Sequence, residues 1–249
     1  MMPGEKFPVM EIFGPTIQGE GAMAGKRCHF VRFGGCDYRC SWCDSMHAVT
    51  PELIKLNAQW LLPHQIVERL EYISILGGRS QWVTLSGGNP GMWDLTSVVE
   101  ELKKAQWKIA VETQGSERRD WLEHCDLITV SPKGPSSGMH HRFNMRALGE
   151  WLTMQDKSSS RLRQVVFKVV IFNQEDLAFA REIRLTYPFV PFYLSVGTPL
   201  EFDTEKGLRH YICEGYKNLS EMALKDDAFS DVTILPQLHV LAWGQEKGR

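Results

Sequence analysis

Short apolar runs recur along the whole chain, and segments with helical spacing lie between them. The runs do not alternate apolar and polar residues strictly, as a half-exposed strand would. Continuous apolar strands of this length are typical of parallel sheets that are covered on both faces. The runs expected to form strands are residues 28–33, 82–86, 108–112, 127–130, 165–172, 191–196 and 231–235.

Two of the intervening segments show the repeat of an amphipathic helix. One lies at residues 95–102 after Asp94, and the other lies at residues 177–185 after Asn173. Strands that alternate with helices predict parallel strands joined by crossover helices. Six or so such units are too few to close an eight-stranded barrel. The chain is therefore expected to be an α/β protein, a partial (open) parallel β/α barrel of about six strands.

Residues 197–229 give a much weaker pattern than the rest of the chain. We expect a loop there, with a helix around residues 208–216. No internal repeat, low-complexity tract or long linker divides the sequence. One domain over residues 1–249 is therefore expected.

Composition narrows the classes of function. Hydrophobic residues make up 43% of the chain and charged residues 23%, which suits a soluble protein with a sizeable core. A formal net charge of -2 argues against nucleic acid as a partner, because phosphate binders usually carry a basic excess. No apolar run approaches the length of a membrane span, and the N-terminus lacks the pattern of a signal peptide. We expect a cytoplasmic protein with no membrane partner.

Three of the six cysteines form a compact motif, Cys36-x3-Cys40-x2-Cys43, directly after the run at 28–33. Thiolates are soft ligands that select zinc, copper(I) or iron–sulfur clusters. A 4Fe–4S cluster normally takes four cysteines, so three leave one iron without a protein ligand. That iron can bind the amino and carboxylate groups of S-adenosylmethionine.

Two other interpretations of the motif stay open on spacing alone. His47 could complete a structural zinc site with the three cysteines. Alternatively, Cys40 and Cys43 could form a redox-active pair. The isolated cysteines are expected to be core or surface residues, since a free cysteine packs as a small hydrophobic residue: Cys28, Cys125 and Cys213.

Polar or glycine-rich segments follow three further apolar runs: Ser86–Pro90, Glu112–Gly115 and Ser131–Lys133. In parallel α/β folds, ligands bind at the carboxyl ends of the strands. We therefore expect these segments and the cysteine motif to face one site. Gly87 and Gly88 lack side chains, so a ligand can approach the backbone closely there.

A polar segment, residues 11–21, precedes the run at 28–33. In this segment Gln18 and Glu20 could recognise a planar, nitrogen-rich heterocycle, since Glu accepts from N–H groups and Gln both donates and accepts. Arg32, in an otherwise apolar run, could pair with a substrate carboxylate.

The motif CxxxCxxC, with Trp42 before its last cysteine, resembles the signature of the radical S-adenosylmethionine superfamily. This resemblance implies a 4Fe–4S cluster and S-adenosylmethionine as cofactors, and reductive cleavage of the sulfonium to a 5′-deoxyadenosyl radical. It also agrees with the partial barrel expected from the apolar runs.

Over about residues 8–244, the chain resembles the 7-carboxy-7-deazaguanine synthase family. The matching segments are Thr16–Gly21, Arg32, the cysteine motif with Asp44 and Ser45, Ser86–Pro90, Glu112–Gly115, Ser131–Lys133 and Pro236–His239. The resemblance implies ring contraction of 6-carboxy-5,6,7,8-tetrahydropterin to 7-carboxy-7-deazaguanine with loss of ammonia. This step belongs to the biosynthesis of queuosine and other 7-deazapurines.

The resemblance also assigns roles residue by residue. The implied cluster ligands are Cys36, Cys40 and Cys43, and the implied Mg2+ ligand is Ser45. The implied substrate contacts are Ile17, Gln18, Gly19, Glu20, Arg32, Ser86 and His239. The implied cofactor contacts are Gly88, Glu112, Ser131, Pro132, Lys133 and Ser195. Asn89 stands where many relatives carry glutamate, and Ser195 where close relatives carry glutamine.

The same resemblance implies a reductant protein such as flavodoxin and a homodimer. A cluster loop at residues 34–45 and a C-terminal segment at 231–249 that caps the substrate are expected. Two alternatives compete with this hypothesis: an activase that installs a glycyl radical on a partner protein, and a zinc-stabilised binding domain that is not an enzyme.

Overall fold

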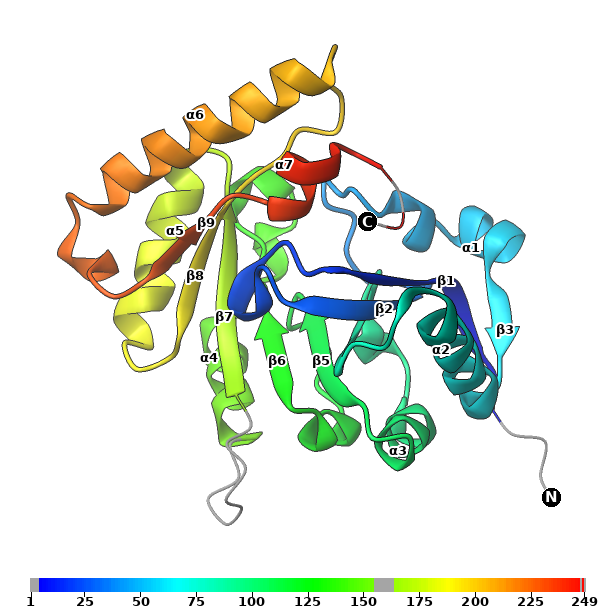
Figure 1. Ribbon diagram of the computed structural model, residues 1–249. Helices are drawn as coiled ribbons and strands as arrows, with labels where there is room; N and C mark the ends of the chain where they lie inside the picture. Colours follow the sequence, from blue (N-terminus) through cyan, green and yellow to red (C-terminus); the bar gives the residue numbers. More distant parts are fainter. Residues whose placement is uncertain (1–4, 155–163, 247, 249) are drawn as a thin grey trace.

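The computed structural model describes residues 5–154, 164–246 and 248. A single twisted sheet forms the centre of the fold (Figure 1). Among these residues the strand order is β3-β1-β2-β4-β5-β6-β7-β8-β9. From β2 to β9 every neighbouring pair is parallel, whereas β1 pairs antiparallel with both β2 and β3. The strands are β1 (Phe7–Ile17), β2 (Arg27–Phe33), β3 (Gln59–Leu61), β4 (Trp82–Gly87), β5 (Lys108–Thr113), β6 (Leu127–Val130), β7 (Gln164–Ile171), β8 (Phe192–Val196) and β9 (Thr233–Leu235).

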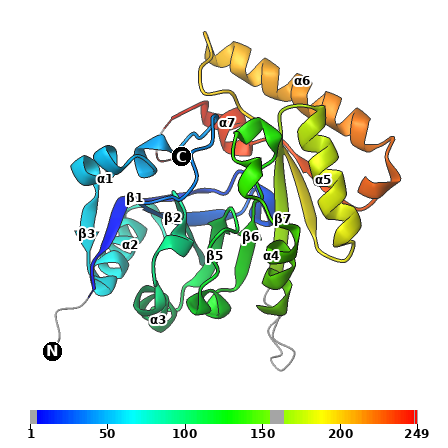
Figure 2. The same cartoon turned by 180° about the vertical axis from the view of Figure 1, so that it is seen from behind.

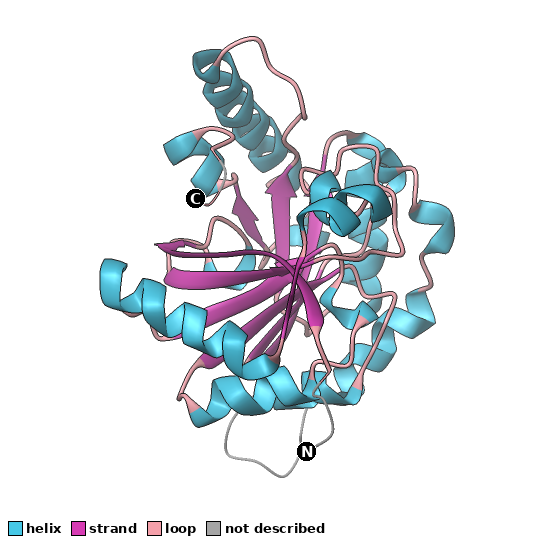
Figure 3. Ribbon diagram, turned by 90° about the vertical axis from the view of Figure 1, so that its right-hand side faces the viewer, coloured by secondary structure: helices cyan, strands magenta, loops and turns pink. Residues whose placement is uncertain are grey.

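The outer face of the sheet carries the main hydrophobic core. Helices α2, α3, α4, α5 and α6 bury apolar side chains against it, as Figures 1 and 2 show from opposite sides. Figure 3 shows the twist that wraps the sheet into an open half-barrel. The helices are α1 (Pro51–Asn57), α2 (Pro63–Gly77), α3 (Thr96–Lys104), α4 (Met145–Glu150), α5 (Gln174–Thr186), α6 (Glu205–Ala223) and α7 (Leu238–Trp243).

The expected fold class is confirmed, since the parallel strands form an unclosed sheet with crossover helices. Each apolar run named in the sequence analysis forms a strand. These strands are β2 and β4 to β9. The helix expected after Asn173 is α5, and the Asn173 side chain caps it by accepting from the backbone N–H of Asp176.

Two strands were not expected. The polar segment at residues 11–21 was taken to precede the first strand, but β1 occupies Phe7–Ile17. Its register with β2 shifts twice, between Val9 and Glu11 and between Phe13 and Thr16. These irregularities break the two-residue alternation by which a strand is recognised from sequence. The three-residue β3 is too short to give any pattern.

The length of the helix in residues 197–229 was also underestimated. The helix expected at 208–216 is part of α6, which runs from Glu205 to Ala223. Thr204 caps it by accepting from the N–H of Gly207, and Leu219 and Ala223 extend its buried face. Among the residues that the structure describes, no helix is long and apolar enough to cross a membrane.

Alternation along the parallel strands places polar residues on the inner face of the half-barrel. On β2, Val31 and Phe33 are buried in the core while Arg32 faces inward. On β7, Phe167 and Val169 are in the core while Lys168 faces inward. The side chains of a strand point alternately to the two faces, so each strand can contribute to both the core and a site.

Candidate active site

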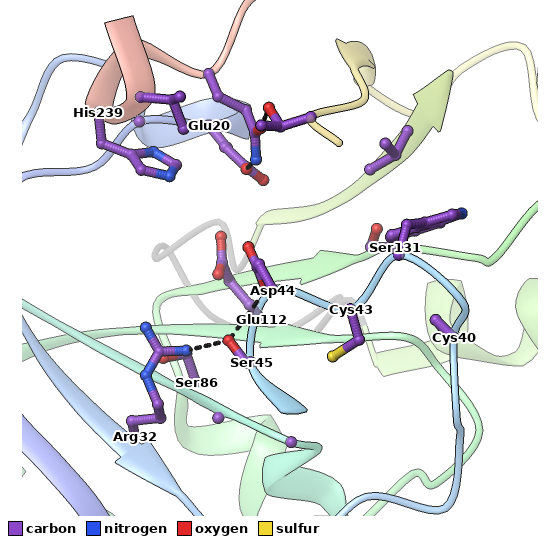
Figure 4. A pocket seen from close by; sticks show the side chains of 18 of the residues that line it. Glu20, Arg32, Cys40, Cys43, Asp44, Ser45, Ser86, Glu112, Ser131 and His239 are labelled. Atoms are coloured by element: carbon purple, nitrogen blue, oxygen red, sulfur yellow. Dashed lines mark hydrogen bonds between the residues drawn. The ribbon is translucent and has the colours of Figure 1, made fainter. Parts of the chain in front are cut away.

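A cavity of about 460 Å³ opens at the carboxyl ends of the parallel strands, within the size range of small-molecule sites (Figure 4). All the site residues expected from the sequence line it except Pro132 and Ser195. Loops that are far apart in the sequence therefore meet at one place. The expected residues on its wall are Ile17, Gln18, Gly19, Glu20, Arg32, Cys36, Cys40, Cys43, Ser45, Ser86, Gly88, Glu112, Ser131, Lys133 and His239.

The three motif cysteines are free thiols on the cavity wall. Burial raises the pKa of each thiol, and it raises that of Cys43 to about 11. Lys133, whose ammonium lies near Trp42 of the same loop, opposes this effect at all three cysteines. The thiols are thus protonated at neutral pH, and binding of iron would release their protons.

Asp37 anchors the cysteine loop to the rest of the site. Its carboxylate accepts hydrogen bonds from Asn89 Nδ2 at 3.2 Å and from Gln114 Nε2 at 2.6 Å. Arg142 lies 3.5 Å from its other oxygen. The Asn89 amide also donates to Ser116 Oγ at 3.2 Å. The loop is therefore tied to the ends of β4 and β5, where the cofactor segments begin.

The side chain of Asn89 is fully buried and does not line the cavity. Its Oδ1 accepts from Gly91 N at 3.1 Å and from Thr113 Oγ1 at 2.9 Å. Because these bonds occupy the amide within the protein, only the backbone of this segment can meet a ligand, and Gly87 and Gly88 line the cavity beside it.

Gly88 is required by close packing. A Cβ atom there would overlap the backbone carbonyl of Gly35 and crowd that of Ala48. Gly88 therefore allows the end of β4 to press against the start of the cysteine loop.

Arg32 donates hydrogen bonds to one carboxylate and to one hydroxyl. Its Nε donates to Glu11 Oε2 at 3.0 Å, and its Nη1 donates to Ser45 Oγ at 2.7 Å. The Ser45 hydroxyl in turn donates to Asp44 Oδ1 at 3.0 Å. Figure 4 shows Arg32 and Ser45 facing each other across the cavity wall. Glu11 was not expected here, because β1 was not recognised as a strand.

Glu20 belongs to a buried polar cluster. Its carboxylate accepts from Lys168 Nζ and from Gln237 Nε2, while Gln18 donates to Glu112 Oε1 at 3.0 Å. Burial opposes ionisation of Glu20, but Lys168, His239 and Gln237 together outweigh it and hold the pKa of the carboxyl well below its usual value. Lys168 was missed from the sequence because it was read as part of an apolar strand.

The C-terminal segment completes the cavity. The N–H of Leu238 donates to Gly19 O at 3.0 Å, and the ring of His239 lies directly against Gly19. A Cβ at Gly19 would overlap that ring. Figure 4 shows His239 and Glu20 on the same side of the cavity, opposite the cysteine loop.

Ser86 lies near the end of β4, and Ser131 directly follows β6, with β5 between these two strands. Within the described residues, the buried Ser86 hydroxyl has no hydrogen-bond partner, which a ligand group could supply. Ser131 accepts from Lys133 Nζ at 3.2 Å. Pro132 and Ser195 are buried but do not reach the cavity wall, so the structure does not bring these two expected residues into the site.

The interpretation of the cysteine motif as a zinc site with His47 differs from this arrangement. His47 Nε2 lies 3.6 Å from Glu11 Oε1, so its partner is a carboxylate on β1. In the described part of the chain, no three His, Cys, Asp or Glu side chains are grouped to hold a single metal ion. A cubane instead takes each thiolate on a different iron, and three thiols around one cavity fit that donor set.

The isolated cysteines lie away from the cavity wall. Cys28 and Cys125 are buried, as expected for packing residues, and burial raises the pKa of Cys28 to about 12. Cys213 is exposed on α6.

Comparison with known proteins agrees with this architecture. Residues 30–152 match the family described as the radical SAM superfamily. A crystal structure of QueE from Escherichia coli aligns with a TM-score of 0.65 at 19% identity, covering 94% of this chain and 95% of that one. A structure of SuiB from Streptococcus suis bound to S-adenosylmethionine aligns over 83% of this chain with a TM-score of 0.51. The fold and the three-cysteine cavity define a radical S-adenosylmethionine enzyme.

Two sequence relatives are more specific. The 7-carboxy-7-deazaguanine synthase of Bacillus subtilis is 41% identical over 97% of this chain and 98% of its own length. The enzyme of that name from Bacillus cereus is 38% identical over 98% and 99%. The chain belongs to the 7-carboxy-7-deazaguanine synthase family.

Proposed function

We propose that this chain converts 6-carboxy-5,6,7,8-tetrahydropterin to 7-carboxy-7-deazaguanine with loss of ammonia, a step in the biosynthesis of queuosine and other 7-deazapurines. One observation carries the proposal: a single cavity joins three free thiols in CxxxCxxC spacing to Gln18, Glu20 and Arg32. The three thiols can ligate an iron–sulfur cluster. The three polar side chains can bind a flat heterocyclic acid.

Cys36, Cys40 and Cys43 would hold the 4Fe–4S cluster, leaving one iron for S-adenosylmethionine. When bound, these groups would supply the radical chemistry that removes a hydrogen atom from the substrate. The backbone at Gly88, with Glu112 and Ser131, would hold the remainder of S-adenosylmethionine. Lys133 stacks its ammonium 5.4 Å from the Trp42 ring, at the edge of the cysteine loop.

On the substrate side, Arg32 would bind the carboxylate. Its guanidinium is now paired with Glu11 and Ser45, so a substrate carboxylate would compete with Glu11 for the same donors. Ionised Glu20 would accept from ring N–H groups, and Gln18 and the Ser86 hydroxyl would complete the set of donors and acceptors. Ile17, Gly19 and His239 would cover the ring.

Ser45 would be the protein ligand of Mg2+. Its hydroxyl and the neighbouring Asp44 carboxylate offer oxygen atoms, which a hard cation prefers. Mg2+ keeps several waters and shares substrate oxygens, so few protein ligands are needed.

We further propose the remaining parts of the working enzyme: one domain over residues 1–249, a C-terminal segment at 231–249 that caps the substrate, a homodimer, and a reductant protein such as flavodoxin. The contact of Leu238 with Gly19 supports the capping role.

An anaerobic assay tests the proposed activity. Reconstituted enzyme, S-adenosylmethionine, a reductant, Mg2+ and 6-carboxytetrahydropterin are incubated, and the products are read by mass spectrometry. We expect 7-carboxy-7-deazaguanine, with S-adenosylmethionine regenerated because the conversion is redox-neutral. If only 5′-deoxyadenosine appears, the substrate assignment is wrong. If neither appears with an intact cluster, an activase acting on a protein partner becomes the better hypothesis.

A further inference from the structure

Lys168 stands out among the buried residues that the expected site did not include. It lies in the middle of β7, between Phe167 and Val169, and only 7% of its side chain is exposed. A buried ammonium without a partner is strongly unfavourable, so such a lysine is retained only where charges or ligands compensate it. Its inward position places it on the cavity wall.

Two carboxylates compensate this charge. Lys168 Nζ donates to Glu20 Oε2, and it lies 4.0 Å from Glu112 Oε1. Burial opposes the charged form of Lys168, but Glu20 and Glu112 outweigh it and raise the pKa of the ammonium above its usual value. The lysine therefore stays charged between the two carboxylates.

These two carboxylates belong to different halves of the cavity. Glu20 lies on the segment after β1, beside Gln237 and His239. Glu112 ends β5 and accepts from Gln18. Lys168 is thus the one cation in the described residues that contacts both Glu20 and Glu112.

We propose that Lys168 is a positioning residue, which keeps Glu20 ionised and directed at the ring N–H groups of the substrate and links it to Glu112 on the cofactor side. The inference rests on the proposed function only for the identity of the ligand. Lys168 itself need not touch the substrate. Its effect passes through Glu20, and this distinguishes it from a residue that merely fills space in the sheet.

Substrate binding to Lys168→Met holoenzyme tests the role. Methionine keeps the length of the side chain and removes the charge. Without Lys168, the buried Glu20 carboxyl should take up a proton at neutral pH and lose its acceptor function. With S-adenosylmethionine present and no reductant, the dissociation constant for 6-carboxytetrahydropterin should rise about tenfold or more near pH 7. It should recover towards the wild-type value as the pH is raised, because Glu20 then ionises again.

Other charged groups face the same cluster: Glu112 from β5, His239 from α7 and Asp44 from the cysteine loop. The wild type and Lys168→Met both retain all of these groups. The difference between their pH profiles of substrate binding therefore reports on Glu20. Lys168→Arg, which keeps the charge, should show the same pH profile as the wild type. Absorbance of the cluster confirms in each variant that the fold and the cysteine loop are intact.

A double-mutant cycle makes the assignment decisive. If Lys168 acts through Glu20, Glu20→Gln with Lys168→Met should bind no worse than Glu20→Gln alone and should show no recovery at high pH. Unchanged affinity in Lys168→Met, a loss that does not recover with pH, or additive losses in the double variant would each overturn the inference. Binding and turnover by wild-type enzyme are measured first, so a failure of the proposed substrate appears there and not in the variants.

Discussion

At the scale of single residues, the cysteine thiols have distinct environments. Cys36, Cys40 and Cys43 line the cavity, whereas Cys213 is exposed on α6. Removing one motif thiolate leaves an iron of the cluster without its ligand, so the remaining two cannot hold it in place.

Cys40→Ala should therefore lose the cluster and all turnover. Iron content and the visible absorbance after anaerobic reconstitution measure the first effect, and product formation measures the second. Cys213→Ser is the matched control and should keep both. Full activity of Cys40→Ala would refute the cluster assignment.

Two glycines test the two halves of the cavity separately. Gly19→Ala should displace the His239 ring and weaken substrate binding about tenfold or more, while the iron content stays normal. Gly88→Ala should push against the carbonyls of Gly35 and Ala48 and lower the iron content instead. Each variant is the control for the other, measured by iron content and by substrate affinity. Equal effects on both quantities would show that the halves are not separable.

Sequence reasoning succeeded at residues whose type is unusual in its local context. Arg32 in an apolar run was recognised in this way. Lys168 has the same property, because a lysine inside a buried strand needs compensation, and that signal was available in the sequence. The partners of these residues were not predictable, since Glu11 and Glu20 meet them only through the register of β1 and the path of the chain after it.

At the scale of elements, the cysteine loop depends on bonds that cross from one strand end to the next. Asn89, at the end of β4, donates to Asp37 in the loop and accepts from Thr113 at the end of β5. An amide can do both, whereas a carboxylate can only accept.

Asn89→Asp should therefore place two carboxylates against each other in a buried setting. We expect a loss of about 2 kcal/mol in the free energy of unfolding, measured by chemical denaturation, and faster loss of iron from the reconstituted protein. Asn144→Asp, at an exposed helix N-cap where aspartate caps equally well, is the control and should be nearly neutral. Retention of iron at the wild-type rate would show that Asn89 does not anchor the loop.

Elements with regular patterns were predictable, and irregular ones were not. The parallel strands are continuous apolar runs because helices and the inner site cover both faces. Two register shifts interrupt the alternation of apolar and polar residues along β1, so the strand could not be recognised from the sequence. The ends of α6 lie in a region of weak periodicity, so its full length could not be predicted. Pro132 and Ser195 follow or lie on predicted strands, but position along a strand does not tell whether a side chain reaches the cavity.

At the scale of the whole molecule, the outer face of the sheet also holds a buried titratable group. His29 on β2 is fully buried, with Nδ1 2.6 Å from Ser80 Oγ and Nε2 3.3 Å from Ser74 Oγ. Burial, aided by Arg27 and Arg79, lowers the pKa of His29 from 6.5 to about 4. The folded state therefore binds this proton less readily than the unfolded chain.

Above about pH 6.5, His29 is neutral in both the folded and the unfolded protein, so it does not make the free energy of unfolding depend on pH. The free energy of unfolding should fall as the pH drops from 6.5 towards 4, because the unfolded chain then takes up the proton first. The loss due to this residue should reach on the order of 3 kcal/mol near pH 4. The free energy of unfolding of His29→Gln should consequently depend less on pH in this window than that of the wild type. The exposed His210→Gln is the control and should keep the wild-type slope. Equal slopes in all three proteins would exclude His29 as the source.

The contact between Leu238 and Gly19 has a consequence for the order in which the site is made. The ribosome releases the cysteine loop and the strand ends that support it within residues 36–133, whereas Gln237 and His239 emerge more than a hundred residues later. A nascent chain can thus present its thiols to the iron–sulfur assembly machinery while the opposite wall is still being synthesised. Order of synthesis alone therefore makes the thiols available before the C-terminal wall of the cavity can form.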